Sequence, residues 1–75
     1  MPKHDPILIA FGQSVRKHRD AKGFSQEVLA EKADLDRTYI SDIERGMRNP
    51  GIKNVVRIAK ALGISLSQLT NGIRA

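Results

Sequence analysis

Apolar residues recur at helical spacing along this sequence, in short runs bounded by residues that start or stop helices. In the first run, Leu8, Phe11 and Val15 follow one another at intervals typical of one face of an α-helix. No segment gives a convincing strand pattern. The sequence therefore predicts an all-α chain with five helices, over residues of about 7–22, 26–33, 37–45, 52–62 and 65–70.

Residues that stabilise helix ends support these boundaries. Ser, Thr, Asp and Asn side chains accept hydrogen bonds from the free N–H groups of a first helical turn, and Gly permits the left-handed turn that ends a helix. The expected N-caps are Asp5 (followed by Pro6), Ser25, Asp36 and Ser65, the last forming a capping box with Gln68. The expected stop residues are Gly23, Gly46 and Gly63.

Length and charge narrow the possible partners. The chain has 75 residues, no cysteine and a net charge of +5, with a sequence pI of about 10.1. This length fits one domain, residues 1–75 with an ordered core of about 6–71, stabilised by packing rather than by disulfides. The positive charge favours a polyanionic partner, either nucleic acid or an anionic membrane. Because we find neither a membrane-spanning run nor a secretory signal, we expect a cytoplasmic protein.

The functional prediction rests on the arrangement of helices and turn between Gln26 and Ile43. Two short helices are separated there by a turn of three or four residues, and the small Ala30 lies in the first helix. This pattern is typical of a helix-turn-helix unit, whose second helix protrudes from the domain. A helix of about 10–12 Å diameter fits the major groove of B-DNA, which is about 12 Å wide. We therefore expect binding to double-stranded DNA.

Polar residues on the second helix supply the expected contacts. Arg37 can donate two hydrogen bonds to guanine, and Thr38 can offer its methyl group to thymine. Base contacts are expected from Arg37, Thr38, Ser41 and Asp42. Phosphate contacts are expected from Gln26, Tyr39, Arg45, Arg48 and Asn49.

These residues also have simpler explanations. Arg37 and Thr38 could lie on a solvated helix face, and Gln26 and Arg48 could be ordinary polar surface residues. Arg45 could stabilise the C-terminal end of its helix, and Tyr39 could be half-buried in packing. The last helix is short, so its apolar residues either cap the core or form a dimer interface. The residues concerned are Leu66, Leu69 and Ile73.

Two segments resemble a known family. They are Gln26-Glu-Val-Leu-Ala30 and Asp36-Arg-Thr-Tyr-Ile-Ser-Asp-Ile-Glu-Arg-Gly46, and they resemble the Cro and phage-repressor helix-turn-helix family, also called the XRE family. The resemblance covers about residues 8–70. It implies a five-helix, lambda-repressor-like domain, a homodimer formed partly through the last helix, and palindromic operators near regulated genes. It also implies a buried ion pair, which Arg19 and Glu44 match.

One run of residues indicates a particular group within this family, and one residue differs from the family pattern. The run from Asp36 to Ser41 and the short chain are most similar to the controller proteins of restriction-modification systems. In the turn between the two helices the family commonly has a left-handed glycine, whereas this chain has Asp34. Aspartate tolerates that conformation at a cost of about 1 kcal/mol.

Catalytic and metal-binding interpretations are weaker. Ser14 and Lys17 fit the S-x-x-K pattern of penicillin-recognising enzymes, but the companion motifs of those enzymes are missing. His4 and His18 are not at ligand spacing and have no cysteine to join. We therefore expect no enzymatic activity, no cofactor, no metal and no small-molecule ligand.

Two other function classes stay open. The first is an antitoxin or other protein-interaction module on the same fold, which would need an apolar extension beyond the last helix, where only Ile73 and Ala75 lie. The second is binding to RNA or to a membrane surface. The chain has only three aromatic residues for stacking, and its basic residues are dispersed over several helices, which disfavours both.

Overall fold

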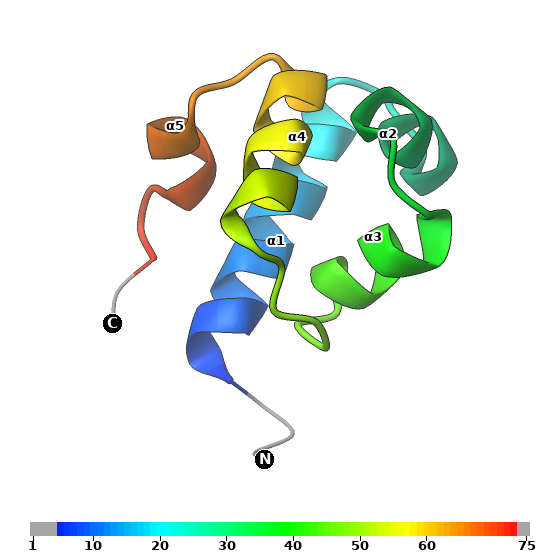
Figure 1. Cartoon of the computed structure of the whole chain (residues 1–75). Coiled ribbons are helices and arrows are strands. Elements are labelled where there is room, and N and C mark those ends of the chain that lie inside the picture. The colour runs from blue at the N-terminus through cyan, green and yellow to red at the C-terminus, as the bar shows by residue number, and fades with distance from the viewer. Residues whose placement is uncertain (1–4, 74–75) are drawn as a thin grey trace.

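The computed structural model describes residues 5–73, along which five helices follow one another (Figure 1). They are α1 (Pro6–Ala21), α2 (Gln26–Ala33), α3 (Arg37–Glu44), α4 (Ile52–Leu62) and α5 (Leu66–Thr70). No strand occurs in this part of the chain. The prediction of an all-α, five-helix fold is confirmed. The predictions for His4 and Ala75 lie outside the described residues.

Side-chain caps begin four of the five helices. The carboxylates of Asp5 and Asp36 and the hydroxyls of Ser25 and Ser65 each accept a hydrogen bond from a backbone N–H of the following turn. The side-chain oxygen of Gln68 in turn accepts a hydrogen bond from the backbone N–H of Ser65, which completes the predicted capping box. Because capping depends on residues close in sequence, these boundaries are set locally.

The helices surround a single small core. In Figure 1, α1 and α4 lie at the centre of the molecule, with α2 and α3 on one side and α5 on the other. The side chains that meet between them are almost wholly apolar, and seven are fully buried. These seven are Val15, Leu29, Ile40, Ile43, Ile58, Leu62 and Leu69.

The turn between α2 and α3 passes through Asp34. Its backbone is left-handed, with φ 57° and ψ 46°, and it is the one non-glycine residue of positive φ within residues 5–73. The next residue, Leu35, donates its backbone N–H to the carbonyl of Ala30 at 2.9 Å, which closes the end of α2. The turn therefore lies at the residue that the sequence indicated.

Candidate nucleic-acid interface

The position of α3 depends on a close approach to α1. Gly12 of α1 is buried, and a Cβ atom built on it would overlap the carbonyl oxygen of Ile43 and lie 2.8 Å from that of Glu44. The side chains of Ile40 and Ile43 fill the core on the same face of α3. The opposite face of α3 is left outward.

A buried ion pair joins the same two helices. The Nε atom of Arg19 lies 2.7 Å from Oε2 of Glu44, and its Nη2 atom lies 3.0 Å from Oε1. The two side chains are 11% and 4% exposed. Arg19 also donates to the carbonyl of Phe24 at 2.8 Å, so this guanidinium links α1, the loop before α2, and α3.

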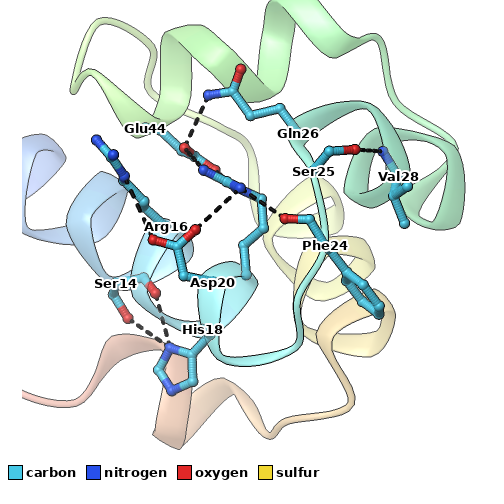
Figure 2. Close-up of polar contacts among 10 residues, drawn as sticks. Ser14, Arg16, His18, Asp20, Phe24, Ser25, Gln26, Val28 and Glu44 are labelled. Atoms are coloured by element: carbon cyan, nitrogen blue, oxygen red, sulfur yellow. Dashed lines mark hydrogen bonds and ion pairs between the residues drawn. The ribbon is translucent and has the colours of Figure 1, made fainter.

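Gln26 completes this network at the start of α2. Its Nε2 atom donates to Oε1 of Glu44 at 3.0 Å, and Figure 2 shows the two side chains pointing toward each other. Since the amide carries two hydrogens, this bond leaves the second one for another acceptor. The pKa of Arg19 is raised, chiefly because its side chain hydrogen-bonds Glu44, while burial acts in the opposite direction. Arg19 therefore stays charged.

The outward face of α3 begins with two exposed residues, Arg37 and Thr38. One turn further along, Ser41 is partly exposed. None of the ion pairs formed among residues 5–73 involves Arg37. Its guanidinium is therefore uncommitted at the end of α3 from which a recognition helix contacts bases.

Asp42 holds two arginines at the other end of α3. Its Oδ1 atom lies 2.6 Å from Nη2 of Arg45, and its Oδ2 atom lies 3.9 Å from Nη2 of Arg48. The side chains of both arginines are more than half exposed, whereas that of Asp42 is 23% exposed. The exposed Asn49 follows in the loop after α3. This end of α3 therefore presents a cationic surface centred on one carboxylate.

Tyr39 lies beside that surface and is held from two sides. Its ring packs against the core, and the guanidinium carbon of Arg48 lies 4.9 Å from the ring centroid. Its hydroxyl accepts a hydrogen bond from Nδ2 of Asn54, in α4, at 3.0 Å. Tyr39 is thus half-buried, and its hydroxyl is already hydrogen-bonded within the domain. Sequence reasoning missed Asn54, since nothing in its local pattern places it near α3.

A comparison with protein-family models matches residues 15–69 to the helix-turn-helix family. The match spans most of the chain and includes every helix described above in whole or in part. The chain belongs to the XRE-type helix-turn-helix family.

Relatives in this family include controller proteins of restriction-modification systems. The control protein C.BamHI of Bacillus amyloliquefaciens is 53% identical over 64 residues, covering 84% of this chain and 79% of the relative. The crystal structure of the controller protein C.AhdI from Aeromonas hydrophila has a TM-score of 0.81 and 47% identity, over 83% of this chain and 94% of that one. The controller protein C.Esp1396I, 45% identical, has been solved as a tetramer in complex with its natural 35 base-pair operator. That structure has a TM-score of 0.78, over 83% of this chain and 82% of that one.

The residues predicted for a dimer interface of this family member separate into two groups. Leu69 is fully buried inside the monomer, where its side chain packs in the core beneath α5. Its assignment to a dimer interface is therefore wrong. Leu66 is 39% exposed and Ile73 is partly buried. Two exposed apolar residues that were not predicted for the interface, Ile7 and Ile52, line a hollow of about 240 Å³ together with Ile73.

Ser14 and His18, two of the residues of the catalytic and metal interpretations, have structural partners. Ser14 donates its hydroxyl to the carbonyl of Leu69 at 2.5 Å, which ties α1 to α5. Nδ1 of His18 donates to the Ser14 carbonyl at 2.9 Å (Figure 2). Within residues 5–73, no three His, Asp or Glu side chains gather as metal ligands would. Among those same residues, no helix is long and apolar enough to cross a membrane.

Proposed function

We propose that this chain is a sequence-specific transcription regulator that binds a palindromic DNA operator as a homodimer. The observation that carries the proposal is the solved complex of its relative C.Esp1396I with an operator. The exposed polar face of α3, held outward by the contacts of Gly12, Ile40 and Ile43, supports the same function here.

In the proposed complex, the start of α3 enters the major groove. Arg37 donates to the O6 and N7 atoms of a guanine, and Thr38 and Ser41 contact the neighbouring bases. Asp42 was predicted to contact a base. We assign it instead to the cationic surface at the other end of α3, because both carboxylate oxygens already lie near guanidinium groups.

Phosphates flank the recognition helix on both sides. Arg45, Arg48 and Asn49 are placed at the C-terminal end of α3, and Tyr39 lies beside them. At the other side, the free amide hydrogen of Gln26 and the N-terminus of α2 suit one further phosphate. Such contacts fix the position of the protein on DNA without selecting a sequence.

The dimer is proposed to form through the apolar residues that the monomer leaves exposed. That surface consists of Leu66 on α5 and of three residues that line the hollow, Ile7, Ile52 and Ile73. A symmetric pair would present two copies of α3 about 34 Å apart, one turn of DNA. Because two chains must associate, occupancy of the operator rises steeply with protein concentration.

The narrower proposal is a controller role in a restriction-modification system, acting in the cytoplasm and catalysing no reaction. It is supported by the named relatives C.BamHI and C.AhdI. In that role, accumulation of the protein would time the expression of neighbouring genes.

Selection of bound duplexes from a random pool tests the proposed function. We expect a consensus with two inverted half-sites whose centres lie about one helical turn apart. Gel shifts with single-stranded DNA, RNA and anionic vesicles serve as controls, and we expect weaker binding to each. A consensus without inverted symmetry would contradict the dimer, and equal affinity for all the polyanions would contradict sequence-specific regulation.

A further inference from the structure

The hydroxyl of Tyr39 is fixed by a residue that belongs to another helix. Tyr39 lies on α3 and Asn54 on α4, and their side chains meet at 3.0 Å with the amide as donor. α3 packs chiefly against α1 and α2, whereas α4 packs chiefly against α2. The hydrogen bond is therefore a direct link between two helices that otherwise share little surface.

The Tyr39 hydroxyl can form one further hydrogen bond as a donor. A phenol has one hydrogen to donate and also accepts, and an amide nitrogen only donates. Because Asn54 supplies the donor in this bond, the hydroxyl hydrogen of Tyr39 is directed elsewhere. A phosphate oxygen is an acceptor only, so it matches the one hydrogen that Tyr39 has left.

The ring leaves the hydroxyl little freedom to move. One part of Tyr39 packs on the core, and Arg48 lies over the ring at 4.9 Å from its centroid. Arg48 is itself 51% exposed on the side chain, on the surface proposed to meet DNA. The Tyr39 side chain thus offers a neutral donor, its hydroxyl, and carries a charged donor, the Arg48 guanidinium, over its ring.

We propose that Asn54 is a positioning residue for DNA binding, which directs the hydroxyl hydrogen of Tyr39 toward a backbone phosphate. This inference rests on the proposed function. Asn54 acts through Tyr39 in it and donates to no phosphate itself. The competing role is direct: Nδ2 of Asn54 could leave Tyr39 and bind the phosphate.

A double-mutant cycle separates the two roles. Asn54→Leu removes the amide at similar volume, Tyr39→Phe removes only the hydroxyl, and the third variant combines both. Affinity is measured by fluorescence anisotropy for the selected duplex and for a random duplex of the same length. Gln13→Leu, which replaces an exposed amide on α1, is the matched control. Melting temperature and helical circular dichroism check folding.

We expect Tyr39→Phe to weaken binding roughly tenfold on both duplexes, because a hydrogen bond to a charged group is lost. Asn54→Leu should weaken binding roughly three- to tenfold, and the combined variant no more than Tyr39→Phe alone. Gln13→Leu should bind as the wild type does.

Two results would overturn the inference while leaving the proposed function intact. One is wild-type affinity for Asn54→Leu. The other is an equal loss from Asn54→Leu with and without the Tyr39 hydroxyl, which would make Asn54 a direct contact. If Asn54→Leu unfolds, Asn54→Ser is measured in its place against the same expectations. Wild-type protein that binds no duplex would instead overturn the proposed function, and this inference with it.

Discussion

The backbone of Gly12 in α1 lies directly against the carbonyl of Ile43 in α3, with no room for a methyl group between them. This contact sets the distance between α3, the proposed recognition helix, and the rest of the domain. A side chain of any size at this position would have to push α3 outward.

We therefore predict that Gly12→Ala destabilises the domain by about 1–3 kcal/mol, the usual cost of overpacking. For a domain of this size that corresponds to a fall in melting temperature of about 4–8 °C per kcal/mol. Affinity for the operator should fall as well. Gly51→Ala is the control, because its φ is −71° and a Cβ there meets nothing within 4 Å. Equal melting temperatures for the two variants would contradict the prediction.

Arg19→Ala should destabilise the protein by about 3–5 kcal/mol, because it leaves the carboxylate of Glu44, whose side chain is 4% exposed, without its charged partner. Thermal denaturation measures the loss. Arg16→Ala is the comparison, since its ion pair with Asp20 is exposed at 3.8 Å and contributes about 0–1 kcal/mol. An unchanged melting temperature for Arg19→Ala would refute a structural role of the pair.

The same pair sets an expectation for pH. A cation whose pKa is raised on folding contributes stability that is fully present below its unfolded pKa and is lost only as the pH passes the folded value. For Arg19 both values lie in the strongly alkaline range. The gap in melting temperature between wild type and Arg19→Ala should therefore stay constant from neutral to moderately alkaline pH.

Asp34→Gly should stabilise the domain by about 1 kcal/mol, because glycine adopts the left-handed backbone of this turn without steric cost. Asp34→Ala should do the opposite, since alanine has a Cβ and no local hydrogen bonding to offset it. DNA affinity should be unchanged by Asp34→Gly. A lower melting temperature for the glycine variant would mean that the Asp34 carboxylate stabilises the turn by more than its backbone costs.

Arg37→Ala should cost about 1–3 kcal/mol on the selected duplex and little on random DNA, as expected for a base contact. Arg48→Ala should weaken binding to both duplexes and reduce the salt dependence by about one charge. Anisotropy titrations at several salt concentrations provide both quantities. Equal losses on the two duplexes for Arg37→Ala would remove this residue from the base contacts.

Asp42→Asn should tighten binding to every duplex by about two- to fivefold, because it frees two arginines from an exposed ion pair and removes a charge that repels phosphate. Its salt dependence should become steeper by about one charge. Asp20→Asn makes the same change in net charge on α1 and should have a smaller effect. Weaker binding confined to the selected duplex would restore Asp42 as a base contact.

Local signals in the sequence predicted most of the fold. Caps such as Ser25 and the pair Ser65 and Gln68 act over three residues, so they are visible without any tertiary structure. The left-handed backbone at Asp34 followed from the family resemblance, in which glycine is common at this turn. The pairing of Arg19 with Glu44 followed from the family resemblance, since 25 residues separate them.

Contacts that depend on how helices pack were beyond the sequence. The apolar face of α5 was visible in its pattern, but which leucine enters the core depends on the rotation of the helix, and Leu69 was misassigned. The bond between Asn54 and Tyr39 and the tight contact of Gly12 each require the angle between two helices. These are also the contacts that set the geometry of the proposed DNA-binding surface.

The hydrogen bond from Gln26 to Glu44 and the ion pair of Glu44 with Arg19 join the start of α2 to α1 and α3. The proposed DNA-binding surface is therefore held in place before any ligand binds. A surface pre-organised in this way sacrifices little conformational entropy on association. Such a surface also changes its shape little on binding. Any bending or groove narrowing needed for a close fit must therefore occur in the nucleic acid. Operators would then be distinguished partly by their flexibility, including at base pairs that no side chain reaches.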